Sequence, residues 1–514
     1  MQMYIPIDRN SKTAIHRQIV LQIEKMIEEG ALSPNSLLPS TRELATLIGI
    51  HRNTVLRAYD ELSARGLVDT VRGSGTFISP SVRLNKNLFE EKTETPVRRQ
   101  RLNWDIIVRQ ECKSELDHQW FSQTHASAAE EKIEFDRYMP DPAFYPYESI
   151  RKITAAVLKH SDRSLFQYGS AAGYEALRNY VRNLAWQQGI DMGKNRVVIV
   201  NGSTQGMDLI SRLILNPGDG VAFGIPSYTG IIRLFSIHGA NIISIPTHED
   251  GLDIDVLEQA VHLHTVKLLY LIPNFHNPTG ITISLNKRRR IMDLAQRSKI
   301  IILEDDYNYQ LRFSGSPLVP LKAMDDFNQV IYAGSFSKIL FPGFRIGWLI
   351  VPMEIFSHVL RVKASLDIST SNLLQAVVYE YCRKGLLDKH LKRIRKINKE
   401  RLETTLASMK RYFPSNVKWR APEGGMMVWV DLPPAYDSLR VQEKAAQQGV
   451  MISASHFFVP RGEKINGFRL SYAAQPAAKI EKGIRILGNI LVESAQKADE
   501  YQGNDNESNG RTII

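Results

Sequence analysis

The chain has 514 residues, of which 43% are hydrophobic and 23% charged, the composition of an ordinary globular protein with two or three domains. We see no signal-peptide pattern and no apolar run near the roughly 20 residues that span a bilayer, so we expect neither secretion nor membrane association. Because Cys112 and Cys382 lack metal-ligand spacing, we expect a reducing cytoplasm, no disulfide framework and no metal site.

The formal net charge of +11 suggests a polyanionic partner, so its distribution along the chain matters. Residues 1–80 hold nine Lys and Arg against eight Asp and Glu, and residues 81–130 hold eight against eight. The excess gathers further on, in the runs 287–290 and 389–401. We interpret both runs as solvated helix faces, with a secondary contact to nucleic acid as the alternative.

Three helices are predicted near the N-terminus. Residues 13–31 place isoleucines at helical spacing, and Ser40-Thr-Arg-Glu43 has the Ser-x-x-Glu pattern of a helix start. Gly49 ends that short second helix, and a third helix is predicted over 51–65. The first turns of this third helix present basic and polar side chains, namely Arg52, Asn53, Thr54 and Arg57. Two helices joined by a glycine turn in this way are typical of a helix-turn-helix.

A β-hairpin is predicted next, with strands 67–71 and 76–78 around the basic, glycine-rich tip 72–75. Helix, helix-turn-helix and hairpin in this order resemble the GntR-type winged helix family over about residues 4–79. We therefore expect an N-terminal α+β domain over residues 1–79. The resemblance implies binding of double-stranded operator DNA through Arg42, Arg52, Asn53, Thr54, Arg57, Arg72 and Gly75. The alternative is a three-helix unit that does not bind DNA.

Two segments have the composition of connecting or terminal chain. Residues 80–130 carry scattered charges and Pro96, which indicates a linker, with one helix expected across Trp104 to Trp120. Residues 496–514 are mostly polar, which favours a disordered tail.

From about residue 131 onward, apolar strand-like runs alternate with helical patterns, as a parallel α/β sheet requires. The clearest strands are predicted at 197–200, 220–223, 242–245, 268–272, 300–303 and 330–332. The chain is thus expected to be multidomain, with an α/β domain over residues 131–495 that includes a smaller α+β lobe at its C-terminal end. Polar motifs follow several of these strands, where α/β proteins place their chemistry.

The motif after the last of these strands contains Lys338 in a glycine-punctuated turn. A lysine at a strand end can form a Schiff base, and neighbouring hydroxyls and an arginine, here Ser335, Ser337 and Arg345, are suited to holding a phosphate. With a pyridinium partner elsewhere, this set indicates pyridoxal phosphate. The alternative is a surface lysine in a serine- and glycine-rich loop.

Other strand ends supply the missing parts. Ser203 and Thr204 lie where a glycine turn leads into a helix, a place that suits a phosphate, although serine and threonine also cap many helices. Tyr228 offers a ring for stacking, with a core tyrosine as the alternative, and Asn277 lies in a sharp turn. Three consecutive acidic residues, 304–306, repel one another and destabilise the fold unless a cation, such as a protonated pyridine nitrogen, lies close to them.

These motifs, in this order, resemble the fold type I aminotransferase family from about Phe135 to Val492. The resemblance implies that Lys338 forms the internal aldimine with pyridoxal phosphate and that Asp305 keeps its pyridine nitrogen protonated. It places Tyr307 and Asn277 at the phenolic oxygen and Tyr228 against the ring. The phosphate would be held by Ser203, Thr204, Ser335, Ser337 and Arg345. Tyr168 matches a segment that reaches a phosphate in the partner subunit, which implies a homodimer.

Arg469 is predicted within a strand of the C-terminal lobe, where an unpaired arginine would be costly. A clamp on a ligand carboxylate explains it, and an internal ion pair is the alternative. A GntR-type reader joined to an aminotransferase-like domain resembles the MocR family of bacterial transcriptional regulators. We hypothesise a DNA-binding regulator that senses a small amino-group effector, an amino acid, an amine or the cofactor itself, through the aldimine at Lys338.

Two other functions remain open from the sequence. Every residue of the catalytic set is present, so the chain could be an aminotransferase with an attached reader. A DNA-binding scaffold that has lost its cofactor is disfavoured by the retention of Lys338, Asp305 and Arg469. Enzymatic turnover is therefore left undecided at this point.

Overall fold

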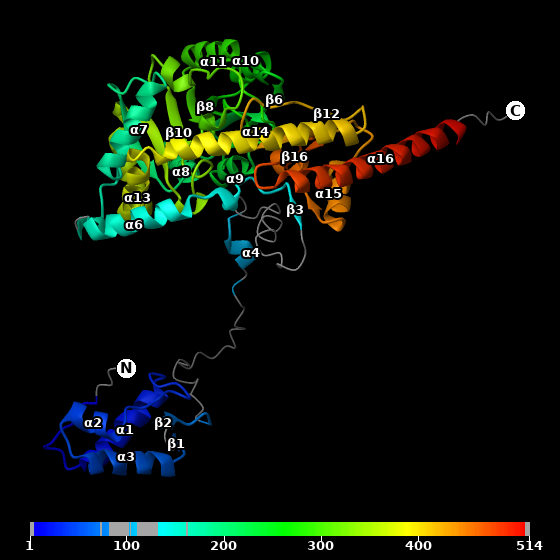
Figure 1. Cartoon of the computed structure of the whole chain (residues 1–514). Coiled ribbons are helices and arrows are strands. Elements are labelled where there is room, and N and C mark those ends of the chain that lie inside the picture. Colours follow the sequence, from blue (N-terminus) through cyan, green and yellow to red (C-terminus); the bar gives the residue numbers. More distant parts are fainter. Residues whose placement is uncertain are drawn as a thin grey trace. The chain divides into compact units, whose positions relative to one another are not determined.

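Figure 1 shows the computed structural model of the chain, which describes residues 5–71, 75–81, 102, 104–109, 132–160 and 163–508. It divides into two compact units, Met1–Trp104 and Asp105–Ile514. Arg72 and most of the predicted linker lie outside the described residues. Of the helix expected across Trp104 to Trp120, the described part is the short segment α4, Trp104–Ile107.

The first unit contains three helices and a two-stranded hairpin, as predicted. Its elements are α1 (Ile15–Glu28), α2 (Thr41–Ile48), α3 (Arg52–Ala64), β1 (Val68–Val71) and β2 (Gly75–Ile78). The two strands pair antiparallel. Apolar side chains from the inner faces of all five elements form one core, which includes Ile23, Leu44, Val55, Val68 and Ile78.

The start of α2 follows its predicted capping pattern. The Ser40 hydroxyl accepts a hydrogen bond from Glu43 N at 3.2 Å, and the Glu43 carboxylate accepts one from Ser40 N at 2.8 Å. Gly49 ends the helix in the left-handed region, with a φ of +67°. Both ends of α2 are therefore fixed by local sequence, and α3 begins only a few residues later.

The second unit is built on an eight-stranded sheet with the order β4-β11-β10-β9-β8-β5-β6-β7. Strands β10, β9, β8, β5 and β6 run parallel, whereas β11 lies antiparallel between β4 and β10. The strands are β4 (Asn195–Val200), β5 (Gly220–Ile225), β6 (Asn241–His248), β7 (Gly251–Leu252), β8 (Val266–Leu271), β9 (Ile301–Asp305), β10 (Val330–Ser335) and β11 (Gly347–Pro352). All six predicted strands are confirmed.

Helices cover both faces of this sheet. Successive residues of β5 face opposite sides, so that Val221 and Phe223 join one core and Ala222 joins another. The core on the Phe223 side is closed by α8 (Ser203–Ile214), α9 (Thr229–Ile237) and α12 (Met353–Asp367), and the other by α10 (Ile254–Leu263) and α11 (Leu285–Ser298). Figure 1 shows α10 and α11 side by side.

A third core joins the large sheet to the C-terminal lobe. It includes side chains from α6 (Tyr147–His160), α7 (Glu175–Gln187), α13 (Asn372–Arg383) and the 27-residue α14 (Leu386–Tyr412). The lobe has an antiparallel sheet, β12-β13-β16-β15, with α15 (Ser438–Gln447) and α16 (Ala477–Ser508). Its strands are β12 (Lys418–Trp419), β13 (Met427–Asp431), β15 (Ser453–Ala454) and β16 (Gly467–Ser471). The predicted α+β lobe is thus present.

A separate two-stranded pairing joins the start of the α/β unit to this lobe. Strand β3 (Ile133–Glu134) pairs parallel with β14 (Val450–Met451).

Strands β10 and β11 pack closely at a glycine. Because Gly334 of β10 lacks a Cβ, the Trp348 indole of β11 fits against it: a Cβ there would lie 2.3 Å from the indole Cε2. The chain that follows β10 therefore starts from a closely packed strand.

Helix α16 continues to Ser508, and the disordered tail from residue 496 stays a prediction. One expectation from charge was wrong in part. Arg288 in the run 287–290 is fully buried, and its guanidinium donates to Pro273 O and Asn274 Oδ1. None of the described helices has the length and apolar character to cross a membrane.

Candidate cofactor site and nucleic-acid interface

Lys338 lies just beyond the end of β10, where the predicted motif places it. Its Nζ donates a hydrogen bond to Tyr138 O at 2.6 Å and lies 4.5 Å from the centre of the Tyr138 ring. Burial above all, followed by the nearby Arg469 and Arg345 cations, lowers the pKa of Lys338 to about 7, against an opposing effect of Asp305. A large fraction of this amine is therefore neutral at neutral pH, which is the nucleophilic form.

Asp305 ends β9, the strand beside β10, and its side chain is 1% exposed. Tyr270 donates its hydroxyl to Asp305 Oδ2 at 2.9 Å, whereas Oδ1 is buried with no hydrogen-bond partner among the described residues. Burial raises the pKa of Asp305 to about 7. A buried carboxylate oxygen without a donor is costly, and a protonated ring nitrogen is a donor of the right kind.

The predicted phosphate residues gather at the start of α8. Helix α8 begins at Ser203, with Thr204 next, so their backbone N–H groups lie at a helix N-terminus. Arg345 Nη2 donates to Asn201 O at 3.2 Å. Gly202 makes room for that contact, because a Cβ there would lie 2.4 Å from Arg345 Nη2.

Two serines at the end of β10 and just beyond it complete this anion-binding arrangement. Ser335 Oγ accepts a hydrogen bond from Ser337 N at 3.1 Å. The Ser337 hydroxyl is buried and has no hydrogen-bond partner among the residues that the structure describes. An additional acceptor, such as a phosphate oxygen, would satisfy it.

The remaining predicted cofactor residues surround Lys338. Tyr228 precedes α9, and burial raises the pKa of its phenol while a hydrogen bond with the Thr204 side chain opposes the rise. Asn277 is 3% exposed, and Tyr307 donates its hydroxyl to the Tyr138 hydroxyl at 3.2 Å. Burial raises the pKa of Tyr307 well above its ordinary value, so the phenol remains a neutral donor.

Arg469 reaches the same cavity from β16 of the C-terminal lobe. The cavity measures about 480 Å³, and its walls include Lys338, Tyr228, Asn277 and Arg469. Arg469 donates to Asn277 Oδ1 at 3.1 Å and to Asp136 O at 2.7 Å, while its Nε is buried without a hydrogen-bond partner in the described chain. No carboxylate among the described residues forms an ion pair with it, so the internal ion pair considered as an alternative is not observed.

Tyr138 is a central residue that the sequence analysis missed. Its hydroxyl accepts from Asn308 Nδ2 at 2.8 Å, its carbonyl holds Lys338, and its ring lies 5.5 Å from the Arg469 guanidinium. Its neighbour Asp136 also lines the cavity and has a buried carboxylate oxygen, Oδ1, without a partner among the described residues. The segment carries no periodic pattern or motif that would have singled it out.

Tyr168 is the one described cofactor residue that does not join this group. Its side chain is 83% exposed and lines a different surface depression, with Ser369, Ser371 and Asn372. Its predicted action in a partner subunit therefore stays a prediction.

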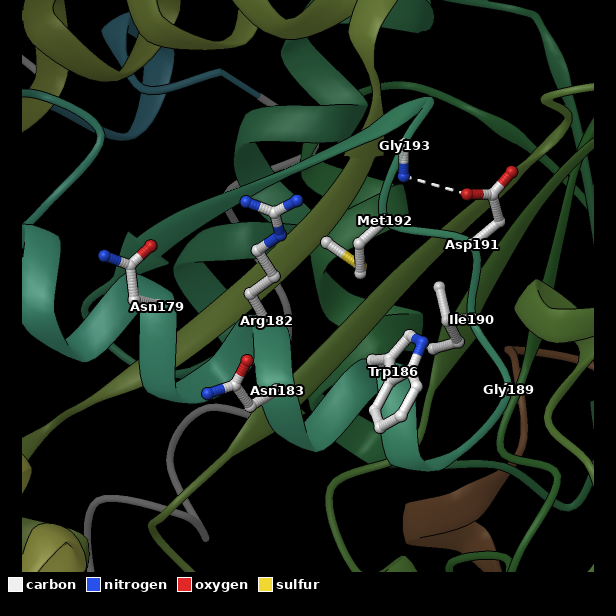
Figure 2. Close-up of a pocket in the computed structure, with 9 residues that line it drawn as sticks. All are labelled: Asn179, Arg182, Asn183, Trp186, Gly189, Ile190, Asp191, Met192 and Gly193. Atoms are coloured by element: carbon white, nitrogen blue, oxygen red, sulfur yellow. Dashed lines mark hydrogen bonds between the residues drawn. The ribbon is translucent and has the colours of Figure 1, made fainter.

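Figure 2 shows a further groove, formed by one face of α7 and the loop after it. Arg182 and the 72% exposed Trp186 lie on its wall. The groove holds none of the predicted site residues, so it is not a candidate for the cofactor.

The predicted DNA residues lie on one helix and its surroundings. Arg52, Asn53 and Arg57 are exposed on the first half of α3, and Thr54 is partly buried. Arg52 and Arg42 line a common surface depression, and Arg52 Nε donates to Thr41 Oγ1 at 3.2 Å. Gly75 of the hairpin has a φ of +120°, where a Cβ would lie 2.7 Å from Leu37 Cδ1. Arg72 lies outside the described residues.

Comparison with known families agrees with this arrangement. Residues 143–487 match "Aminotransferase class I and II", and residues 15–78 match "Bacterial regulatory proteins, gntR family". The chain belongs to the class I and II aminotransferase family. Its aminotransferase domain is preceded by a GntR helix-turn-helix domain, which implies DNA binding.

Relatives with known names fall into two groups. An HTH-type transcriptional regulator of Bacillus subtilis, YdfD, is 30% identical over 94% of this chain and 97% of its own. MocR of Rhizobium meliloti, a probable rhizopine catabolism regulatory protein, is 25% identical over 95% of each chain. Aromatic-amino-acid aminotransferase 1 of Thermococcus litoralis is 35% identical over 70% of this chain and 88% of its own. The two-domain arrangement is thus that of MocR-type regulators.

A solved relative of the aminotransferase domain contains a phosphopyridoxyl ligand. The α-aminoadipate aminotransferase LysN of Thermus thermophilus, complexed with N-(5'-phosphopyridoxyl)-L-leucine, superimposes with a TM-score of 0.70 at 29% identity, over 77% of this chain and 100% of that one. The family and this relative imply pyridoxal phosphate. The unpartnered Asp305 Oδ1 and Ser337 Oγ fit its ring nitrogen and its phosphate.

Proposed function

We propose that the protein is a pyridoxal phosphate-dependent transcriptional regulator that senses a small amino-group ligand at Lys338 and binds operator DNA through its GntR domain. One observation carries the proposal. One cavity holds both the Lys338 amine, whose pKa is lowered to about 7, and the guanidinium of Arg469. The same chain exposes Arg52, Asn53 and Arg57 on α3.

The cavity supports an α-amino acid as the effector better than a simple amine. The cofactor supplies an aldehyde carbon that bonds reversibly to amines. Arg469, with an unpartnered Nε, is suited to a carboxylate, which a simple amine lacks. Asp305 Oδ1 would hold a proton on the ring nitrogen, and Tyr228 would stack on the ring. An amino acid, an amine and the cofactor itself all remain candidates, in this order of support.

The proposed assembly is a homodimer in the cytoplasm. The exposure of Tyr168, away from the cavity of its own chain, supports a site completed by a second copy. Two GntR domains would then contact two half-sites of an operator, which suits the near-neutral charge of residues 1–80 because each domain needs only modest affinity.

The experiment measures DNA affinity of the full-length, cofactor-loaded protein against a site selected from random DNA, in a panel of amino acids and amines. We expect at least one ligand to change the affinity by about 5- to 150-fold, the usual range of allosteric coupling. The variant Lys338→Met should bind the same DNA without ligand but lose the response. The exposed Lys464 supplies the matched control, since Lys464→Met should respond like the original chain. A response that persists in Lys338→Met would overturn the proposal.

The second candidate function is an aminotransferase with an attached reader. Lys338, Asn277 and Arg469 line one cavity, and Asp305 acts electrostatically on Lys338, which favours this function, as does the similarity to named aminotransferases. A multiple-turnover assay with amino donors and a keto acid acceptor decides the matter. Steady product formation that is lost in Lys338→Met would establish turnover.

A further inference from the structure

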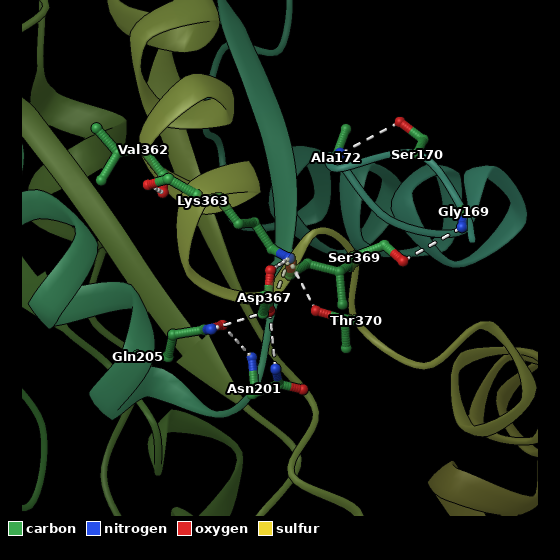
Figure 3. A network of polar contacts seen from close by, with 12 residues as sticks. Gly169, Ser170, Ala172, Asn201, Gln205, Val362, Lys363, Asp367, Ser369 and Thr370 are labelled. Carbon is green, nitrogen blue, oxygen red and sulfur yellow. Dashed lines mark hydrogen bonds and ion pairs between the residues drawn. The ribbon is translucent and has the colours of Figure 1, made fainter. Parts of the chain in front are cut away.

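Two charged residues of α12 lie behind the loop that begins α8 (Figure 3). Lys363 is fully buried, and its Nζ pairs with the Asp367 carboxylate at 2.8 and 3.0 Å. Burying a lysine is expensive even when it is paired, and hydrophobic residues of similar volume often stabilise a fold as well or better. An ion pair that buries its lysine completely at this position therefore calls for a reason other than stability.

The carboxylate of the pair is bonded to both ends of the phosphate loop. Asp367 Oδ2 accepts hydrogen bonds from Asn201 Nδ2 at 2.8 Å and from Gln205 Nε2 at 2.9 Å. Gln205 Oε1 in turn accepts from Asn201 N at 2.7 Å. Gly202, Ser203 and Thr204 lie between these two anchored residues, so a single carboxylate fixes the span of the loop (Figure 3).

The charge of Lys363 has a distinct part in this arrangement. A negative carboxylate behind an anion-binding loop would by itself repel a phosphate. The ion pair cancels that charge while leaving Asp367 able to accept from Asn201 and Gln205. The loop thus gains a rigid anchor without a net negative charge behind it.

The same helix end also contacts the segment that carries Tyr168. Two residues beyond Asp367, the Ser369 hydroxyl accepts a hydrogen bond from Gly169 N at 3.2 Å (Figure 3). The phosphate loop and the predicted partner-facing segment are therefore both attached to the C-terminal end of α12.

We propose that Lys363 and Asp367 are positioning residues for the phosphate group of the cofactor, acting through Asn201 and Gln205. The inference rests on cofactor binding at this site and is independent of the regulatory role proposed above. It assigns a function in ligand affinity to an i,i+4 ion pair whose lysine is buried: Asp367 sets the shape of the loop, and Lys363 removes the charge that would oppose the phosphate.

The test compares two ligands that differ by the phosphate alone. The dissociation constants of pyridoxal phosphate and of pyridoxal are measured on cofactor-free, full-length protein from the visible absorbance of the bound ligand. In Asp367→Asn and in Lys363→Met we expect the constant for pyridoxal phosphate to rise about tenfold or more. The constant for pyridoxal should change less than about twofold, since pyridoxal makes no use of the loop.

A second buried ion pair serves as the matched control. Lys322 and Asp325 are also buried, at 2.9 Å, and Asp325 accepts from the backbone N–H groups of Gln329 and Val330 instead of from the phosphate loop. Asp325→Asn should lower the thermal unfolding temperature but leave the ratio of the two dissociation constants unchanged.

Two results would overturn the inference. One is an equal weakening of both ligands in Asp367→Asn, which would mean a general structural role. The other is an unchanged constant for pyridoxal phosphate. If Asp367→Asn does not fold, Gln205→Ala decides the question, because it removes one anchored end of the loop from a partly buried position. It must then show the same selective loss for pyridoxal phosphate, and an unselective loss or none would refute the inference.

Discussion

At the scale of single residues, the site combines two groups whose pKa values are moved toward neutrality from opposite sides. Burial lowers that of Lys338 and raises that of Asp305, each to about 7. Both shifts come from the loss of water around a charge that the cofactor-free protein pairs incompletely. The chain thus stores an unfavourable electrostatic arrangement that a suitable ligand relieves.

The first prediction concerns the pH dependence of cofactor attachment. The rate at which pyridoxal phosphate bonds to the cofactor-free protein should rise with pH and level off above about pH 7, because the neutral amine is the reacting form. Arg469→Met removes the second cause of the lowered pKa, so the midpoint should move to higher pH. Stopped-flow absorbance measures this, and Arg461→Met, at an exposed position, is the control. A midpoint that stays or falls in Arg469→Met would contradict the assignment.

The second prediction concerns the stability that the folded protein loses by burying the Asp305 carboxylate. Its folded pKa is raised, so the folded state loses stability as the pH rises from about 4 to about 7, and the loss is complete above that. Asp305→Asn removes the charge and can still accept from Tyr270, so the cofactor-free variant should unfold at a higher temperature at pH 8, with the difference vanishing near pH 4.

The same variant should bind pyridoxal phosphate about tenfold or more weakly, because a charged hydrogen bond is lost. Calorimetry and ligand titration check the two halves separately. Lower stability at pH 8 would show that the Asp305 carboxylate is satisfied in the cofactor-free protein.

At the scale of elements, function depends on how strand ends and helix starts are joined. The turn between β4 and α8 contains Gly202 with a φ of +82°, packed against Arg345 from the loop between β10 and β11. Because β11 lies between β4 and β10, residues that are far apart in sequence meet at the same end of these three strands. The phosphate site is therefore a property of the strand order.

A pair of glycines tests this close approach. Gly202→Ala places a Cβ 2.4 Å from Arg345 Nη2, so it should push the guanidinium away and weaken binding of pyridoxal phosphate by at least about tenfold. Gly218 has a φ of +89° and nothing within 4 Å of an added Cβ. Gly218→Ala should thus impose a similar backbone strain of about 1–2 kcal/mol and leave the affinity unchanged. Equal affinities in the two variants would argue against a steric role for Gly202.

The elements also show how far sequence reasoning reaches. Strands and their polar ends were predictable, because apolar runs alternate with turns, and Lys338, Asp305 and Asn277 lie at the ends of such runs or a few residues beyond. Tyr138 was not, since its place depends on β3 pairing with β14, more than three hundred residues away in sequence. Lys363 and Asp367 have the spacing of a surface ion pair, and their burial follows only from the packing of α12.

Arg288 shows that a run of charged residues does not by itself predict which side chains are exposed. A run of four basic residues predicted a solvated face, yet the helix turns one of them inward toward the loop that carries Asn274. A run of charged residues describes only the local composition. The direction of each side chain is set by helical periodicity and by the elements against which the helix packs. The DNA-contacting role of Arg72, the disposition of the linker and the dimer remain predictions.

At the scale of the whole molecule, the GntR domain and the aminotransferase domain have separate hydrophobic cores. Arg52→Ala should therefore weaken binding to a selected DNA site by about 1–3 kcal/mol while leaving the affinity for pyridoxal phosphate unchanged. Electrophoretic or anisotropy titrations measure the first quantity, and absorbance the second. Arg461→Ala, at an exposed position in the other unit, is the control for loss of positive charge. Unaltered DNA binding in Arg52→Ala would contradict the assignment of α3 to the DNA interface.

The packing of Trp348 against Gly334 has a practical consequence. The indole is 3% exposed and lies against β10, the strand that ends at Ser335, three residues before Lys338. A chromophore bound at that lysine would accept excitation energy from the indole, so intrinsic fluorescence should dim as the site fills. Trp348→Phe would identify the part of the quenching that this ring contributes. The chain thus contains its own optical reporter of occupancy, which allows titrations without a label.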